Sequence, residues 1–291
     1  LITPKWKQSP VKPDVDDPSV MISTDQLETR LGDNRLCIID LSKTEHFAQG
    51  HIPGASHLDY ASLVDGRKPA PGQLPSRARL EQLASRLALH ETRFVVACDD
   101  EGGGRAARLL WTLHVLGHRN CSVLDGGMTA WRGEGRRLTT QAASYTATSF
   151  QLSTLDHTPI ATREYILSHL EDKRVALLDV RTPEEYAGTK QLSARSGHIP
   201  GAVNLNWLET IDHDNHLQLK PKAVLAKMLA NRGIRPTQEV ITYCQTHHRS
   251  AHSWMVLKYM GYHSVRGYPG SWSEWGNDPE TPIQLNSQNR S

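Results

Sequence analysis

The residues best suited to chemistry lie together in one short segment, directly after an apolar run that reads as a buried strand. The segment is Cys244, Gln245, Thr246, His247, His248, Arg249 and Ser250. The thiolate, not the thiol, is the nucleophile, and a helix N-terminus or a neighbouring cation favours it. We therefore expect a lowered pKa for this cysteine, through Arg249 and through His247 and His248 when these are protonated. Inward backbone N–H groups over 245–250 would also hold an extra anionic atom on the sulfur.

A repeated hexapeptide indicates how the chain positions this segment. The sequence GHIPGA occurs at 50–55 and again at 197–202. An apolar run that ends in aspartate precedes each copy, at 37–40 and at 176–179. Further along, matching residues lie a constant 144 positions apart. Self-similarity of this kind indicates a duplication, so the sequence predicts two equivalent domains.

Each half alternates short apolar runs with amphipathic stretches, which is typical of βα units around a parallel sheet. We expect strands at 95–97 and 240–242, each followed by a polar loop and a helix, at 106–116 and 252–260. The predicted fold class is therefore α/β, with two domains that each have a mostly parallel sheet flanked by helices. In such sheets the chemistry lies beyond the carboxyl ends of the strands.

Length and composition limit the remaining possibilities. At about 100 to 200 residues per domain, 291 residues predict two domains. We divide the chain into a flexible tail at 1–20, a first domain at 21–140, a linker at 141–158 and a second domain at 159–287. A net charge of +2 does not favour nucleic acid, and no apolar run approaches the roughly 18 residues of a membrane span.

Cysteine usage points to a reducing compartment. The four cysteines form no CxxC pair and lack the density of a disulfide-stapled secreted domain. We expect a cytoplasmic monomer. The chain begins at Leu1, so the removal of an N-terminal targeting segment stays open.

The duplicated GHIPGA motif, the strand-end aspartates, the GYPGSWSEW segment at 267–275 and the CQTHHRS segment at 244–250 resemble the two-domain rhodaneses, most closely those of the bacterial thiosulfate type. The resemblance covers nearly everything after the tail. It implies a thiosulfate sulfurtransferase in which Cys244 takes a sulfane sulfur from a donor, forms a persulfide and passes the sulfur to cyanide or a thiol, without a cofactor. The segment between GHIPGA and the catalytic strand lines the pocket in related enzymes, which makes Trp207 a candidate wall. The implied substrate-binding residues are Gln245, Thr246, His247, His248, Arg249, Ser250 and Trp207.

Other kinds of chemistry fit the segment less well. The C-x4-R spacing is one residue shorter than the C-x5-R loop of cysteine-dependent phosphatases, so phosphatase or arsenate reductase chemistry is a minor alternative. Cys244, His247, His248 and His252 stand at helical spacing and could bind zinc, but Arg249 among them would oppose a cation. We therefore expect no metal.

Two alternatives within sulfur chemistry stay open. One is a 3-mercaptopyruvate sulfurtransferase, although Glu185 stands where related enzymes carry a substrate-binding arginine. The other is a persulfide carrier or sensing module that serves a protein partner without rapid turnover. A carrier would load once and stall with a small acceptor, whereas an enzyme would cycle.

The first domain supplies an internal comparison. The offset of 144 matches Cys244 with Asp100 and places Cys98 inside a strand. Asp99, Asp100 and Glu101 would then crowd three negative charges where the second domain has its sulfur, and repel anionic donors. We expect this domain to be catalytically silent.

Three further side chains are expected to have structural roles. His51 and His198, one in each GHIPGA copy, are expected to form hydrogen bonds, with Asp40 and Asp179 as candidate partners. Arg181 is expected to form an ion pair with Glu184 or Glu185.

Overall fold

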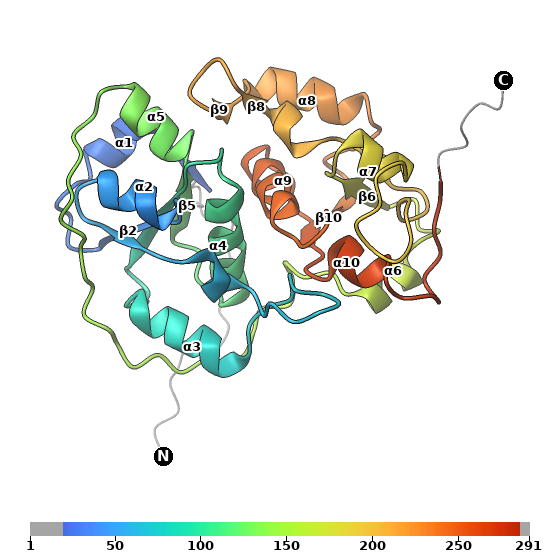
Figure 1. Ribbon diagram of the computed structural model, residues 1–291, viewed down its shortest axis with the longest axis horizontal. Coiled ribbons are helices and arrows are strands. Elements are labelled where there is room, and N and C mark those ends of the chain that lie inside the picture. The colour runs from blue at the N-terminus through green and yellow to red at the C-terminus, as the bar shows by residue number, and fades with distance from the viewer. Residues whose placement is uncertain (1–19, 286–291) are drawn as a thin grey trace.

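The computed structural model describes residues 20–285 (Figure 1). The predicted tail therefore lies almost entirely outside the described residues. The first half folds around a sheet of five parallel strands in the order β1-β5-β4-β2-β3. Its strands are β1 Met21–Ile22, β2 Leu36–Asp40, β3 Ala55–His57, β4 Phe94–Cys98 and β5 Cys121–Leu124. Its helices are α1 Thr24–Glu28, α2 Thr44–Gln49, the 3-10 turn η1 Tyr60–Leu63, α3 Arg77–Arg86, α4 Gly104–Val115 and α5 Gly127–Gly133.

The second half repeats this plan around a parallel sheet in the order β11-β10-β6-β7. Its strands are β6 Val175–Asp179, β7 Val203–Asn204, β10 Glu239–Tyr243 and β11 Val265–Gly267, with an antiparallel pair β8 Ile211–Asp212 and β9 Gln218–Leu219. Its helices are α6 Arg163–Ser168, α7 Pro183–Ala187, the 3-10 turn η2 Trp207–Thr210, α8 Lys222–Ala230, α9 Arg249–Tyr259 and α10 Ser271–Trp275. The predicted fold class, two α/β domains with mostly parallel sheets, is confirmed.

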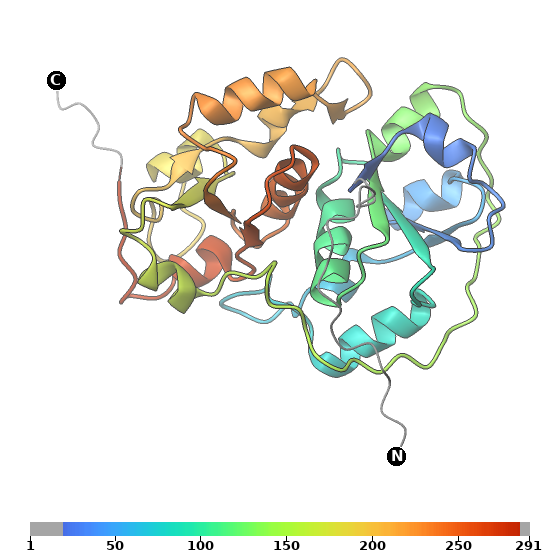
Figure 2. The same ribbon diagram turned by 180° about the vertical axis from the view of Figure 1, so that it is seen from behind.

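The two domains meet through helices α4 and α9, which pack side by side between the sheets (Figures 1 and 2). One apolar cluster contains buried side chains of both helices, among them Trp111 and Trp254. Each helix follows the central strand of its own sheet, so the carboxyl ends of β4 and β10 both lie near this contact. The fold therefore brings the first domain's strand-to-helix loop close to the segment at 244–250 of the second.

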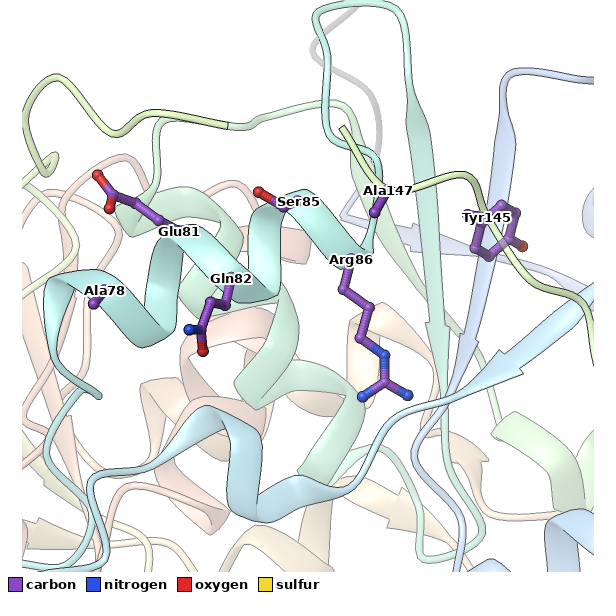
Figure 3. Close-up of a pocket in the computed structure, with 7 residues that line it drawn as sticks. All are labelled: Ala78, Glu81, Gln82, Ser85, Arg86, Tyr145 and Ala147. Atoms are coloured by element: carbon purple, nitrogen blue, oxygen red, sulfur yellow. The ribbon is translucent and has the colours of Figure 1, made fainter. Parts of the chain in front are cut away.

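The segment at 141–158 contains no helix or strand, yet it is tied to the first domain along its outer edge (Figures 1 and 2). The Tyr145 hydroxyl donates to the Gly54 carbonyl (2.7 Å), and the Phe150 N–H donates to Ser85 Oγ (3.1 Å). Figure 3 shows a cavity of about 460 Å³ between this segment and α3. The limits of the linker stay a prediction, but the segment packs as part of the first domain's surface.

Two sequence-based expectations about the repeated motifs are wrong. His51 and His198 do not bond to the aspartates; their Nδ1 atoms lie 2.9 and 2.8 Å from the carbonyls of Phe47 and Tyr186, at the ends of α2 and α7. A histidine stacked on the preceding helix reaches that helix's free carbonyls first.

Arg181 pairs with Asp179 rather than with a glutamate of α7. Its Nη2 lies 2.6 Å from Asp179 Oδ2, and it also donates to the Gly197 carbonyl. Asp179 is the last residue of β6, and Arg181 follows it by two positions. None of the helices within residues 20–285 is long and apolar enough to cross a bilayer.

Candidate active site

Cys244 is the first residue after β10, at the carboxyl edge of the second sheet, and it is fully buried. A loop at 244–248 separates it from α9, which begins at Arg249, three residues earlier than predicted. The earlier start places Arg249 and Ser250 in the first turn of the helix. Their backbone N–H groups have no partner inside the helix and are free to interact with the loop.

The loop is held in an unusual conformation by a residue from another segment. His247 has a φ of +55°, which is uncommon for a side chain other than glycine. The Ser271 hydroxyl oxygen accepts the N–H groups of His247 (3.1 Å) and Cys244 (3.4 Å), and Ser271 Oγ donates to the Tyr268 carbonyl (2.7 Å). Ser271 thus braces the turn. It lies inside the segment at 267–275 that carried part of the resemblance, but no pattern identified the serine itself.

Electrostatics favour the ionised form of Cys244. Burial alone would raise the pKa of its thiol. The Arg249 guanidinium, the Ser250 hydroxyl 3.5 Å from the sulfur, and the backbone N–H groups of Ser250 and Thr246 outweigh burial and lower the pKa. The direction agrees with the expectation from the sequence. The arrangement suits a sulfur that carries negative charge.

Arg249 is held by a carboxylate rather than left free for a ligand. Its guanidinium donates two hydrogen bonds to Glu185, at 2.7 and 2.8 Å, and the Glu185 side chain is almost fully buried. Glu185 reaches this position because it is the third residue of α7, which Thr182 caps. The residue that replaces the substrate-binding arginine of related enzymes therefore orients the cation beside Cys244.

The two histidines of the loop have different environments. His247 is fully buried, with its ring edge-on to Trp111 (4.4 Å) and its Nδ1 2.7 Å from Ser250 Oγ. Burial, with Arg108 and His248, lowers its pKa well below the usual value, so it adds no positive charge. His248 is partly exposed and pairs through Nε2 with Glu101 of the first domain.

Gln245, Thr246 and Trp207 surround the loop in different ways. The Gln245 side chain points to the loop before the second GHIPGA motif and donates to Ser193 Oγ (3.1 Å). Thr246 presents its carbonyl to the first domain, where a Cβ on Gly72 would lie 2.1 Å from it, so only glycine fits. Trp207 is buried, with its ring 6.1 Å from the His248 ring.

The first domain contributes groups that sequence reasoning missed. The ring of Tyr60 lies edge-on to His248 at 5.3 Å, and its buried hydroxyl has no protein partner. Burial raises the pKa of Tyr60 to about 12, so its hydroxyl is neutral. Arg108 on α4 donates to the His247 carbonyl. No local pattern marks either residue, because their proximity to Cys244 depends on how the domains dock.

The strand register changes the comparison between the two loops. Asp40 pairs with Cys98 on β4 as Asp179 pairs with Tyr243 on β10, so the residue equivalent to Cys244 is Asp99 and not Asp100. The offset of 144 holds at the C-terminal ends of α4 and α9, whereas β4 and β10 and the loops that follow them are offset by 145. Helix α4 has 12 residues and α9 has 11, and this difference explains why Cys244 was matched with Asp100.

The three acidic residues of the first loop lie close together, and each also has partners of its own. Burial and the nearby Glu101 raise the pKa of Asp99. The Asp99 carboxylate accepts backbone N–H groups of Glu101, Gly103 and Ala106 at 2.8–3.0 Å, Asp100 pairs with His46, and Glu101 pairs with His248. These contacts compensate part of the negative charge of the loop. Among residues 20–285, no group of three or more histidine, cysteine, aspartate or glutamate side chains is placed to hold a metal ion.

Comparison with known proteins assigns the architecture. The family model of the rhodanese-like domain matches twice, at residues 23–134 and 162–278. The chain belongs to the rhodanese family. A thiosulfate sulfurtransferase of Pseudomonas aeruginosa is 43% identical to this rhodanese over 92% of this chain and 98% of its own. The sulfur carrier protein TtuD of Thermus thermophilus is 33% identical over 91% and 96%.

A solved structure agrees in fold. The crystal structure of YnjE superposes with a TM-score of 0.79 at 20% identity, over 87% of this rhodanese and 63% of that chain. At this identity the likeness concerns the fold alone.

Proposed function

We propose that this rhodanese is a thiosulfate sulfurtransferase that works through a persulfide on Cys244. The observation that carries the proposal is a fully buried thiol whose pKa is nevertheless lowered, at the carboxyl end of the central strand of its sheet. The similarity to a thiosulfate sulfurtransferase over nearly the whole chain supports the same activity.

The reaction divides into two displacements. In the first, the Cys244 thiolate attacks the sulfane sulfur of thiosulfate; the S–S bond of thiosulfate breaks, sulfite leaves with the bonding electron pair, and the enzyme holds a persulfide anion. In the second, cyanide or a thiolate attacks the outer sulfur, and Cys244 leaves as the thiolate. The enzyme's sulfur is anionic before and after each displacement, as a thiolate or as a persulfide, so no general base is required.

The loop residues have distinct proposed roles. The N–H groups of Thr246 and Ser250 and the Ser250 hydroxyl stabilise the anionic sulfur. Arg249 supplies the adjacent positive charge and is oriented by Glu185. His247 fills the core of the turn in its neutral form. His248 and Trp207 border the sulfur site on the side of the first domain.

Glu185 does not decide between the donors, because the related eukaryotic thiosulfate enzymes and the mercaptopyruvate enzymes both carry an arginine at this position. Here the carboxylate binds Arg249 instead. We favour thiosulfate over 3-mercaptopyruvate because the loop resembles the bacterial thiosulfate type and relatives over most of the chain are thiosulfate sulfurtransferases.

A persulfide carrier for a protein partner is the second candidate, because one relative over most of the chain is a sulfur carrier protein. The two functions differ in turnover with a small acceptor. We further propose a cytoplasmic monomer, since all four cysteines are free and buried.

The test is intact-mass spectrometry of the protein with thiosulfate and then with cyanide. We expect one added sulfur, about 32 Da, on the wild type, its removal by cyanide, and no addition to Cys244→Ala. Cys98→Ala is the matched control, because Cys98 ends the equivalent strand of the first domain and burial raises its pKa well above the usual value. That variant should load like the wild type.

Two results would change the assignment. Sulfur that loads once and is not released to cyanide or a small thiol would indicate a carrier. Loading of Cys244→Ala to the wild-type level would contradict the role of this cysteine.

A further inference from the structure

Arg108 is a fully buried arginine of the first domain that reaches the catalytic loop of the second. Its guanidinium donates to three backbone carbonyls: Leu63 (3.0 Å) and Gly72 (2.9 Å) in its own domain, and His247 (3.4 Å) across the interface. The guanidinium carbon lies 4.8 Å from the centre of the Trp111 ring. All these contacts are neutral, so none of them balances the positive charge.

Two other arginines near the second sheet, the buried Arg181 and the partly buried Arg249, have a carboxylate partner. Arg181 pairs with Asp179, and Arg249 pairs with Glu185. Within residues 20–285, no carboxylate forms an ion pair with Arg108. A buried charge without a counter-ion is costly, by several kcal/mol, and proteins rarely retain one without a use.

The groups near Arg108 that are able to carry negative charge are Tyr60 and Cys244. Tyr60 stays neutral at ordinary pH, which leaves the sulfur. Arg249 acts more strongly on Cys244, but Glu185 already compensates its charge, whereas no carboxylate compensates that of Arg108.

We propose that Arg108 is a positioning residue of the sulfur site, contributed by the domain that lacks the nucleophile. It holds the carbonyl of His247 in the left-handed turn, and its positive charge balances the negative charge of Cys244 in the thiolate and persulfide states. The inference rests on the proposed function for the persulfide state. It gives the first domain a chemical role, because the catalytic loop receives one of its two cations from there.

Substitution of Arg108 by glutamine and by lysine separates its charge from its shape. The measurement is the rate of alkylation of the Cys244 peptide by iodoacetamide as a function of pH. Removing an uncompensated cation near the sulfur should raise the apparent thiol pKa by about one unit in Arg108→Gln, and slow alkylation about tenfold below that pKa. Arg108→Lys keeps the charge and should stay close to the wild-type pKa, with weaker persulfide retention because it lacks the planar fork.

Trp111→Phe is the matched control. It disturbs the same helix and the same interface by removing the indole hydrogen bond to the Pro159 carbonyl, but it changes no charge. We expect its Cys244 pKa to equal that of the wild type. Circular dichroism and urea unfolding verify that each variant is folded.

Alkylation requires no sulfur donor, so this test is independent of the proposed function. If wild-type protein fails to load sulfur while Arg108→Gln still raises the thiol pKa, the proposed function fails and the counter-ion role stands. A folded Arg108→Gln with a wild-type pKa and wild-type persulfide loading would overturn the inference. If the glutamine variant does not fold, the lysine variant decides: a rise of a full pKa unit with the charge retained would overturn it equally.

Discussion

The loops that follow the central strands of the two sheets have the same length and opposite chemistry. Residues 99–103 connect β4 to α4, and residues 244–248 connect β10 to α9. Each begins with a buried residue whose side chain accepts N–H groups from its own loop and from the first turn of the helix. In the first domain that acceptor is the Asp99 carboxylate; in the second it is the Cys244 sulfur.

The pKa of Asp99 is raised and that of Cys244 is lowered, and the backbone N–H groups do not cause this difference. Burial and the nearby Glu101 raise the pKa of Asp99 in spite of three N–H donors. Burial acts on Cys244 as well, but Arg249 reverses the outcome. In the first loop the available cation, Arg105, is paired with Glu101 and Asp100 instead. The comparison shows that the loop accommodates an anion, while an adjacent cation makes the anion favourable.

The largest expected effect comes from making the catalytic loop a copy of the silent one. Cys244→Asp removes the nucleophile, so we expect thiosulfate:cyanide turnover to fall by about a thousandfold or more. The carboxylate should accept the N–H groups that face the sulfur and pair with Arg249, so urea unfolding should show this variant to be at least as stable as Cys244→Ala. A variant clearly less stable than Cys244→Ala would mean that the two loops are not equivalent.

The reverse experiment removes the acceptor from the first loop. Asp99→Ala leaves the buried N–H groups of Glu101, Gly103 and Ala106 without their partner, which should lower the free energy of unfolding by about 3 kcal/mol. Folded protein should keep its turnover, because the nucleophile is in the other domain.

Urea unfolding and steady-state kinetics measure the two effects. Asp100→Asn is the control: its partners are His46 and Arg105 at the partly exposed rim, so the loss should be smaller. A fall in turnover per folded molecule of Asp99→Ala would argue that the first loop takes part in the chemistry.

These comparisons also show where sequence reasoning stops. The strand positions and the duplication follow from the sequence pattern, and the structure confirms them. Local rules suffice there because apolar runs and caps act within a few residues. The loop after β10 was located for the same reason.

The predictions that failed depend on strand register and on contacts between residues that are far apart in the sequence. The match of Cys244 with Asp100 assumed one constant offset, whereas strand pairing sets it to Asp99. Whether His247 adds a positive charge was left open by its residue type, and burial against Trp111 keeps it neutral. Arg108 and Ser271 carry no motif, since each reaches the loop only after the chain has folded.

The role of the second-domain cation can be tested without leaving a buried charge unpaired. In the double variant Arg249→Gln, Glu185→Gln, both partners become neutral amides, and we expect the Cys244 pKa to rise by about one unit. Alkylation rate against pH is the measurement, and below the pKa the rate should fall about tenfold. The single variant Glu185→Gln is the control, because it keeps the cation and should not raise the pKa. An unchanged pKa in the double variant would assign the lowered pKa to the backbone N–H groups, the Ser250 hydroxyl and Arg108 instead of Arg249.

The smallest expected effect concerns the contact between the two loops. Glu101→Gln removes the ion pair with His248, and because both side chains are about a quarter exposed, the loss should be about 1 kcal/mol or less. Burial opposes ionisation of Glu101, but His248 and Arg105 lower its pKa. A carboxylate with a lowered folded-state pKa stabilises the fold above its unfolded pKa of about 4.3, and this contribution is lost as the pH falls through the folded pKa.

The difference in unfolding free energy between wild type and Glu101→Gln should therefore be present at pH 6–7, shrink below the unfolded pKa of about 4.3 and vanish once the pH is below the lowered folded-state pKa of Glu101. Urea unfolding across this range measures it. Because Cys244 is fully buried and His248 belongs to the same loop, weakening this contact should also speed alkylation by a small factor at fixed pH. Slower alkylation would mean that the Glu101–His248 pair orders the loop at 244–248 and does not restrict access to the Cys244 sulfur. The first domain would then act on the sulfur through His248 as well as through Arg108.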